Sequence, residues 1–335
     1  MKKLLYLLMI LAVAAPLAAE TAKVGSAGAQ FLKIGVGSRY QGMGEASVAT
    51  VSDVYAAYWN PAGLAEVENW SVGFTTVNWL LDVNLNYAVM AHYFENVGTF
   101  AVSATVLSMN DQEITTVLEP EGTGQKYSAA SYALGLSYAR QLTARFAFGC
   151  TAKYIGEEIG EVDARGFGLD FGTLLYTGFR TMRIGMSISN MGSDMEFTGS
   201  SVKVSYINPG LDPEEDPQVS SDAELTTTPY SLPLTFRVGL AYDVEFGPKS
   251  VVTLASEFKH PNDNEQRGSI GAEFAYDDRF FLRGGYKINY DEETFALGGG
   301  LSTGMGEDTR LFIDYSWQDF GRLEAAQRFS VGFTF

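Results

Sequence analysis

Few side chains in this sequence have the types and spacing that catalysis or metal binding needs. Its histidines are His92 and His260, and its single cysteine is Cys150. If His92 points into an interior from the strand expected around it, Ser103 could approach it as the nucleophile of a hydrolase, although a lone inward histidine more often only forms hydrogen bonds. No His/Cys cluster has the spacing of a zinc site. We therefore expect no enzyme, no metal and no cofactor.

An acidic stretch offers another possible ligand set. The carboxylates of the run LDPEEDP could bind Ca²⁺ through oxygen ligands, and a solvated acidic loop is the alternative. These carboxylates are Asp212, Glu214, Glu215 and Asp216. Five prolines between positions 209 and 233 keep this stretch extended, and so it is a candidate for partner contact or for a lid.

Net charge and cysteine usage exclude several classes of protein. The formal net charge is −17 at pH 7, and loss of Lys2 and Lys3 with the leader described next makes the balance more acidic. A chain this acidic does not fit a nucleic-acid partner. Because Cys150 is alone, no internal disulfide forms, and an exported chain must then be stabilised by a closed hydrogen-bond network.

The first 69 residues divide into two parts. Residues 1–19 combine two lysines, an apolar run over 4–15 and small residues ending at Ala18-Ala19, which indicates a cleavable export signal too short to span a bilayer. Residues 20–69 are rich in Gly, Ala and Ser and do not alternate. We predict a compact segment there, with one or two short helices around 41–51 and a turn at Asn60-Pro61. A nucleotide loop is not expected, because no strand precedes the glycines and GxGxxG is absent.

From Trp70 to Phe335, apolar and polar residues alternate with a period of two, as in the final run RFSVGFTF. Aromatic residues make up 13% of the chain and 36 residues are Gly, which suits many short strands. Each run is close to the length of a tilted transmembrane strand, and their number is even, as in bacterial barrels. The fourteen runs cover residues 70–79, 84–94, 98–108, 128–140, 144–157, 164–176, 181–190, 232–243, 249–260, 266–277, 279–290, 294–303, 309–318 and 326–335.

Charged side chains in these runs fall on one parity. A cation on the lipid face costs about 2–4 kcal/mol near the midplane, so this parity should point into a polar lumen of mixed sign. Trp70 and Trp79, and Trp317 with Tyr290, should mark the interfacial girdles, with a sandwich-core role as the alternative for Trp317. The expected inward set is Lys153, Asp170, Arg183, Arg237, Glu257, Lys259, Glu273, Arg283, Lys287, Asp314 and Arg328.

The connections between the runs give an independent check. With the N-terminus on the periplasmic side, even-numbered connections are periplasmic and odd-numbered ones are external. The even ones include short turns such as Glu95-Asn96-Val97, whereas the two longest connections, about 109–127 and 191–231, are both odd. Short periplasmic turns and long outer loops are typical of outer-membrane barrels.

These patterns predict an all-β fold, a fourteen-stranded antiparallel transmembrane β-barrel with an N-terminal hatch. The expected divisions are an export signal over 1–19, a hatch inside the barrel over 20–69 and the barrel over 70–335. Such a protein lies in the cell outer membrane and contacts its lipid. A soluble secreted β-sandwich or propeller is the alternative, and extraction without detergent would distinguish it.

Two stretches of the hatch resemble a known family. The run GSRYQGMGEA from Gly37, followed by YWNPAGLA from Tyr58, resembles the PorV/PorQ family of outer-membrane proteins, which is similar to FadL-type transporters of long-chain fatty acids and other hydrophobic compounds. The resemblance implies a fourteen-stranded barrel with a hatch in its lumen. Its hatch motif corresponds to Asn60, Pro61, Ala62, Gly42 and Gly44, and the terminal Phe335 resembles the signal read by the barrel-assembly machinery.

The resemblance implies two different uses. PorV members serve type IX secretion, in which they receive folded cargo proteins and pass them to surface-attachment machinery, whereas FadL relatives admit apolar molecules. We expect a PorV/PorQ-type transport or secretion protein, with a FadL-like passive channel as the alternative. Inward apolar side chains could bind such a ligand or could only pack the hatch against the wall. They are Phe31, Leu32, Ile34, Met90, Phe94, Leu107, Ile155, Leu174 and Phe281.

Overall fold

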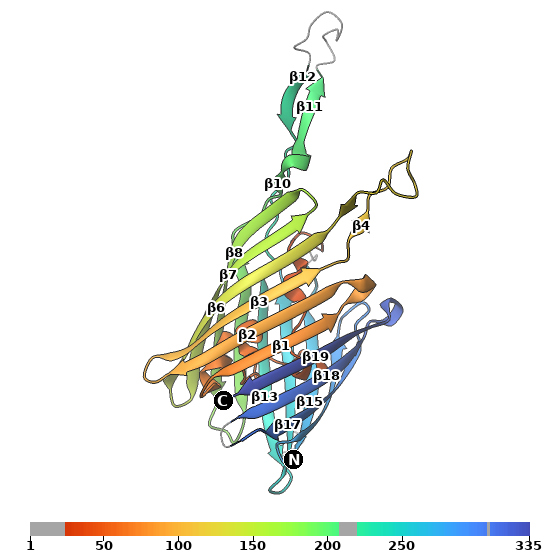
Figure 1. Cartoon of the computed structure of the whole chain (residues 1–335). Helices are drawn as coiled ribbons and strands as arrows, with labels where there is room; N and C mark the ends of the chain where they lie inside the picture. The colour runs from red at the N-terminus through yellow and green to blue at the C-terminus, as the bar shows by residue number, and fades with distance from the viewer. Residues whose placement is uncertain (1–23, 208–219, 307–308) are drawn as a thin grey trace, which may run out of the picture.

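A computed structural model describes residues 24–207, 220–306 and 309–335. The expected export signal over 1–19 and the acidic run at 212–216 lie outside these residues. The alternating region forms one closed antiparallel barrel (Figure 1). Its fourteen strands are β1 (Ser71–Asn78), β2 (Asn84–Phe94), β3 (Gly98–Ser108), β6 (Ala129–Thr143), β7 (Phe146–Ile159), β8 (Val162–Tyr176), β9 (Arg183–Gly192), β13 (Thr235–Glu245), β14 (Ser250–Pro261), β15 (Arg267–Tyr276), β16 (Phe280–Ile288), β17 (Phe295–Gly304), β18 (Arg310–Asp319) and β19 (Ala325–Thr334).

Two pairings make the sheet continuous around the ring. The first strand pairs with the last, with Ser71 opposite Thr334, and β8 pairs with β9. Closure leaves no strand edge facing lipid. At such an edge, unpaired N–H and C=O groups would be exposed to hydrocarbon at a high cost in free energy. The all-β, fourteen-stranded antiparallel barrel is therefore confirmed, and each observed strand begins and ends within three residues of its expected run.

The two ends of the barrel differ in the length of their connections. The strand pairs β2/β3, β6/β7 and β15/β16 are joined by short turns at one end, the short-turn end. At the other, the long-connection end, two extensions project beyond the barrel (Figure 1). One carries β4 (Gln112–Glu113) and β5 (Lys126–Tyr127); the other carries β10 (Thr198–Gly199), β11 (Lys203–Ile207) and β12 (Ser220–Glu224).

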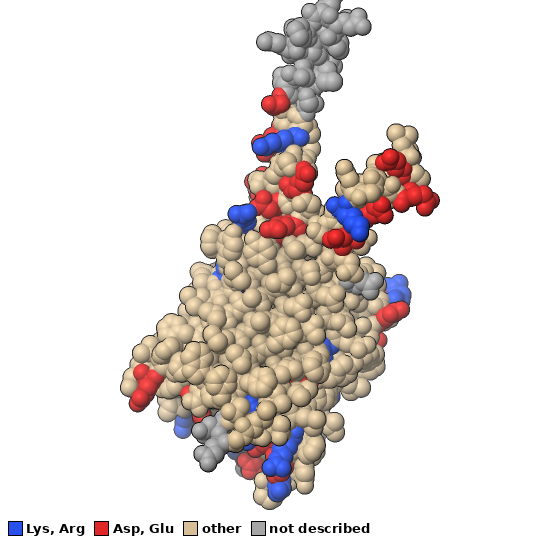
Figure 2. Space-filling view, viewed as in Figure 1, with Lys and Arg blue, Asp and Glu red and all other residues tan. Residues whose placement is uncertain are grey.

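The outer face of the barrel is apolar between its two ends. Large exposed hydrophobic side chains recur at every second position, as with Phe280, Leu282 and Tyr286 of β16. Figure 2 shows a broad band with few charged residues, and charges gathered at both ends. This band is the surface that contacts acyl chains. Among the described residues no helix is long and apolar enough to cross a membrane.

Two of the expected girdle residues point inward instead. Trp70 lies outside, where its ring stacks on His92 with centroids 4.1 Å apart. Trp79 has the inward parity, and its ring packs edge-on against buried Phe320. Tyr290 follows the end of β16 with its hydroxyl buried. The assignments of Trp79 and Tyr290 were wrong because Trp79 continues the inward parity of β1, and because Tyr290 lies beyond the end of β16, where its ring packs under Arg267 and Lys287.

Residues 24–69, the N-terminal segment, lie within the barrel (Figure 1). The segment contains η2 (Gln30–Lys33), α2 (Ser38–Gly42), α3 (Ala56–Trp59) and η3 (Pro61–Glu66); further short helices are η4 (Leu80–Asp82), η5 (Ser200–Val202) and η6 (Gly321–Leu323). Its helices are too short to bury a face of their own, so wall contacts must stabilise them.

The N-terminal segment runs the length of the lumen. Ala27 forms a parallel bridge with Ser231 at the long-connection end, and the segment joins β1 at the short-turn end. The first described residues therefore lie at the end that carries the projecting extensions. The expected periplasmic N-terminus concerns residues before Val24, which lie outside the described part of the chain.

Candidate functional site in the barrel lumen

Glu45 of the N-terminal segment is held by two lysines of the wall. Its carboxylate lies 2.7 Å from Lys287 Nζ and 3.4 Å from Lys259 Nζ. Burial alone would raise the pKa of Glu45, but the two ammonium groups outweigh burial and hold it well below the ordinary value of 4.5. Glu45 therefore stays ionised and anchors the segment to β14 and β16.

A second ion-pair group binds Arg39 to the wall. Its guanidinium donates to both carboxylate oxygens of Glu273 at 3.0 and 2.7 Å. Glu273 also accepts from Arg283 at 2.6 Å, and Arg283 in turn pairs with Asp314. Such bidentate guanidinium–carboxylate geometry fixes orientation as well as distance, so helix α2 has one angle against the wall.

Backbone groups of the segment find wall partners in the same region. Glu257 accepts hydrogen bonds from the N–H groups of Ser47 and Val48 at 2.9 and 2.8 Å, and lies 3.4 Å from Arg237. Buried Arg328 donates to the carbonyl oxygen of Gly35 at 3.0 Å. These bonds satisfy polar groups that would otherwise be costly to bury between segment and wall.

The inner faces of β13 to β19 are called the charged half of the lumen. In the described parts of the chain, all ion pairs between segment and wall come from this half or from its β14–β15 connection, where Lys33 meets Asp263 at 2.9 Å. The other expected inward charges pair within the wall: Lys153 with Asp170 at 2.6 Å and Arg183 with Asp243 at 2.7 Å.

The Asn60-Pro61-Ala62 step lies against the opposite wall. Asn60 Nδ2 donates to the carbonyl oxygens of Val48 and Thr173 at 2.7 and 3.1 Å, and its Oδ1 accepts from the N–H of Ala62. A Cβ at Gly172 would lie 2.0 Å from Asn60 Oδ1, and one at Gly149 would lie 2.3 Å from the carbonyl carbon of Pro61. Two paired glycines thus leave the room that this step fills.

The predicted glycines Gly42 and Gly44 approach the charged half. A Cβ at Gly42 would lie 3.0 Å from the Cα of Gly298, and Gly44 has φ +65 with its Cβ position 3.0 Å from the backbone of Tyr286. Only a residue without a side chain adopts this backbone and fits this contact without strain. Both glycines therefore let backbone meet backbone across the lumen.

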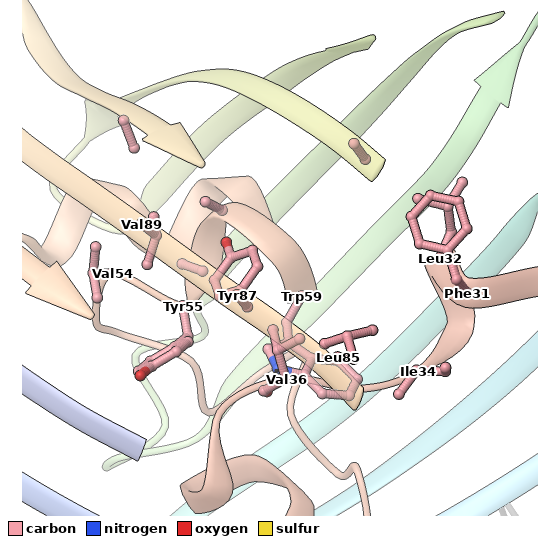
Figure 3. Close-up of a cluster of buried hydrophobic side chains, with 14 of the residues drawn as sticks. Phe31, Leu32, Ile34, Val36, Val54, Tyr55, Trp59, Leu85, Tyr87 and Val89 are labelled. Carbon is pink, nitrogen blue, oxygen red and sulfur yellow. Dashed lines mark hydrogen bonds between the residues drawn. The ribbon is translucent and has the colours of Figure 1, made fainter. Parts of the chain in front are cut away.

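The inner faces of β1, β2, β3, β6, β7 and β8 form the apolar half. They pack against Phe31, Leu32, Tyr55 and Trp59 of the segment in one cluster (Figure 3). The charged exceptions in this half are Lys153 and Asp170, which pair with each other, and Glu157, which accepts hydrogen bonds from Tyr230 and Ala29. The cluster members from the wall are Val77, Leu85, Tyr87, Val89, Ala91, Ala101, Ala133, Ala139, Ile155 and Ala164.

The expected apolar contacts divide between the two faces of the wall. Four of them belong to the cluster, namely Phe31, Leu32, Ile34 and Ile155, and Leu107 packs against it. Leu174 is buried beside Ala62 and Ala147. Phe281 lies on the inner face under the guanidinium of Arg283.

Met90 and Phe94 point to lipid instead, with exposed fractions of 42% and 46%. His92 shares their parity, stacks on Trp70 and meets Phe94 edge-on, whereas Ser103 faces inward. The assignments of Met90, Phe94 and His92 to the lumen were wrong because the inner face of β2 is itself apolar, so hydropathy did not distinguish the faces. No hydrolase pair forms from His92 and Ser103.

A cavity of about 410 Å³ lies at the short-turn end. It is half open to solvent and is lined by the last residues of the N-terminal segment, including Ala65 and Val67, by the β2–β3 turn and by the end of β6, where Arg140 and Gln141 are polar. Thr99 lines it with a buried hydroxyl that has no partner among the described residues. The cavity continues the apolar half, because Val67 and Ala139 belong to both.

Of two further predicted sites, one is located in the structure and the other lies outside the described residues. Phe335 lies beside Trp70, and the two residues exchange backbone hydrogen bonds of 2.9 and 3.1 Å at the short-turn end. The proposed Ca²⁺ ligands at 212–216 lie outside the described residues, and within those residues no group of acidic, histidine or cysteine side chains could hold a metal ion.

Sequence reasoning missed the contacts that depend on two distant strands. The Lys33–Asp263 pair, the ring of Trp59 under Arg237 and the fit of Asn60 into Gly172 were not predicted. Inward-parity glycines were the available signal, since small residues inside a strand mark close approach of another backbone.

The barrel is similar to solved hydrocarbon transporters despite low sequence identity. The toluene transporter TodX of P. putida has a TM-score of 0.58 at 12% identity, covering 89% of this chain and 98% of its own. The monoaromatic hydrocarbon channel CymD gives 0.56 at 13%, covering 90% and 97%, and the Ralstonia pickettii toluene transporter TbuX gives 0.54 at 14%, covering 89% and 97%. These likenesses establish the fold alone, and no curated protein matches in sequence.

A match to a family model identifies the protein family, which the similar structures do not. The model described as type IX secretion system protein PorV matches residues 17–209, which is more than half of the chain. Together with the closed barrel and its apolar belt, this match indicates an integral outer-membrane protein. The chain belongs to the PorV family.

Proposed function

We propose that the protein is an outer-membrane secretion factor that binds exported proteins at its long-connection end and conducts no solute in its resting state. The observation that carries this proposal is the N-terminal segment, which is tied to the wall by ion pairs at Lys33, Arg39 and Glu45. A segment fixed at several levels supports a closed lumen. The family match supports a role in type IX secretion.

The projecting extensions are the proposed binding surface. Acidic side chains gather on them (Figure 2). Charge of one sign steers an oppositely charged partner, so we propose a partner with a basic surface that binds more weakly as salt is raised. By the usual asymmetry of such barrels this end faces the cell exterior. The acidic residues are Asp111, Glu113, Glu119, Glu121, Asp194, Glu196, Asp222 and Glu224.

Copurification from native membranes tests the proposal. The tagged protein should retain an exported protein or a surface-attachment component at low salt. Neutralising Asp111, Glu113, Glu119 and Glu121 to their amides should reduce the yield of that partner. Neutralising Glu95 and Asp278 at the short-turn end is the matched control and should not. Equal yields from both variants would contradict the role of the extension.

A second candidate function is passage of small apolar molecules along the apolar half. The cavity that continues this half at the short-turn end favours it, as does the similarity of the fold to a toluene transporter and a monoaromatic hydrocarbon channel. Toluene entry into vesicles containing the protein would support this function. Ala139→Phe, which fills the path next to the cavity, should then reduce entry, and Ala88→Phe on the outer face is the control.

A further inference from the structure

The first described residues meet the base of the β11–β12 extension at one compact contact. Gly28 donates its N–H to the carbonyl oxygen of Ser231 at 3.0 Å, and Ala27 bridges Ser231 in parallel. Tyr230 precedes Ser231 and exchanges two 2.9 Å backbone hydrogen bonds with Met195 across the base of the extension. The N-terminal segment is therefore joined by one parallel bridge to the base of the extension, beside the Met195–Tyr230 pair.

Side chains close the same contact. The ring of Tyr230 lies on the backbone of Gly28, where a Cβ would come within 2.1 Å of a ring carbon. The Tyr230 hydroxyl donates to Glu157 Oε2 of β7 at 2.8 Å, and the N–H of Ala29 donates to the same oxygen at 3.3 Å. One carboxylate oxygen thus binds both the extension and the segment.

Each partner continues into a larger unit. Beyond Ala29, Gln30 and Lys33 bind Asp263, and the segment then reaches Arg39 and Glu45. On the other side, the Tyr230 ring packs on Phe197, whose carbonyl oxygen accepts from Thr227. Tyr230 therefore contacts both units.

We infer that Gly28, Tyr230 and Glu157 form a latch that couples the N-terminal segment to the β11–β12 extension, so that opening either one loosens the other. The coupling is reciprocal, as linkage between two sites requires. Its role in secretion rests on the proposed function, because a partner bound to the extension would then release the outer end of the segment. The latch itself involves this chain alone.

Two readouts on purified protein in lipid nanodiscs test both directions. The first is the rate at which an impermeant maleimide labels Ala27→Cys in a Cys150→Ala background. Tyr230→Ala and Glu157→Ala should speed labelling about 5- to 30-fold, the factor that corresponds to one or two lost hydrogen bonds. Tyr138→Ala removes a tyrosine whose hydroxyl bonds Val97 at the short-turn end, and it should change nothing.

The second readout is trypsin cleavage after exposed Lys203 of β11. Gly28→Ala, which adds a methyl against the Tyr230 ring, should speed this cleavage by a similar factor. Gly284→Ala is the control, because its Cβ would meet nothing closer than 3.9 Å. Adding Gly28→Ala to Tyr230→Ala should give no further increase.

Barrel folding is checked in every variant by heat-dependent migration on gels. A variant that does not fold is excluded, and Glu157→Gln is tested instead. Cleavage at Lys203 within about twofold of wild type in folded Gly28→Ala would overturn the coupling. Because no partner protein is present, that outcome would leave the proposed binding of exported proteins untouched, and absence of a partner in copurification would leave the latch untouched.

Discussion

At the residue scale, Glu45 is the carboxylate on which the charged half depends. It pairs with Lys287 and Lys259, whose ammonium groups lie 2.7 and 3.4 Å away, and Lys287 also pairs with Glu293 of the β16–β17 connection. Removing one partner of a buried ion pair costs about 3–5 kcal/mol, because the remaining charge stays buried. Glu45→Gln should therefore lower the free energy of unfolding in urea by about that amount. A change under about 1 kcal/mol would contradict this anchoring role.

The same residue gives the protein a specific pH dependence. Since the folded-state pKa of Glu45 lies well below 4.5, its contribution to stability is complete above that value and is lost as pH falls through the folded pKa. The unfolding free energy of wild type should decline in acid more steeply than that of Glu45→Gln. Lys33→Met, which breaks a different contact of the segment, should leave the Glu45 component in place. Parallel pH curves for wild type and Glu45→Gln would refute the assignment.

Gly172 tests the fit of the Asn60-Pro61-Ala62 step. A methyl at Gly172 would lie 2.0 Å from Asn60 Oδ1, and overpacking of this kind costs about 1–3 kcal/mol. Gly172→Ala should destabilise the barrel by that amount in urea unfolding. Combining it with Asn60→Ala should recover part of the loss, and Gly284→Ala should be neutral. Equal effects of Gly172→Ala and Gly284→Ala would remove the argument for close contact.

Single residues were predicted most consistently where charge identified the face. Arg283 and Lys287 lie inward as their parity indicated, because a charge in lipid is costly. Met90 and Phe94 were assigned to the wrong face because β2 carries apolar residues on both sides, one toward lipid and one toward the segment. Parity separates the two faces of a strand only when one face is apolar and the other polar. The inner face of β2 packs against the apolar N-terminal segment, so both of its faces are apolar.

At the element scale, strands were easier to predict than the segment inside them. Each strand repeats a local pattern with turns at its ends, so its limits follow from nearby residues. The segment has no such period. One or two short helices were expected around 41–51, whereas helix α2 covers Ser38–Gly42, because its position depends on Glu273 and Gly298 across the lumen.

Removal of the N-terminal segment tests whether it closes the lumen. Deleting residues 24–60 removes the groups that fill the space beside both halves, while the strands and their pairings remain. Conductance of planar bilayers should rise from near zero to that of an open barrel. Deleting residues 112–127, which carry β4 and β5 outside the barrel, is the control and should not raise conductance. Unchanged conductance after the first deletion would mean that the segment is no plug.

At the scale of the whole molecule, the wall separates lipid from a packed interior, and the four tryptophans report on both sides. Trp70 and Trp317 lie outside, where Trp317 packs on exposed Phe295, whereas Trp59 is fully buried and Trp79 packs inside against Phe320. The predicted girdle did not separate them, because it placed Trp79 outside although Trp79 and Trp70 have opposite parity. Which tryptophans touch acyl chains is therefore a property of the closed ring and its contents.

Lipids brominated along their acyl chains should quench the tryptophan fluorescence selectively, because bromine quenches only on contact. The variant that keeps Trp70 and Trp317, with Trp59→Phe and Trp79→Phe, should be quenched strongly. The complementary variant that keeps Trp59 and Trp79 should be quenched little, since the wall excludes acyl chains from the lumen. Equal quenching of the two variants would mean that lipid reaches both faces, and neither a closed secretion factor nor a guided path for apolar solutes would then be consistent with the barrel.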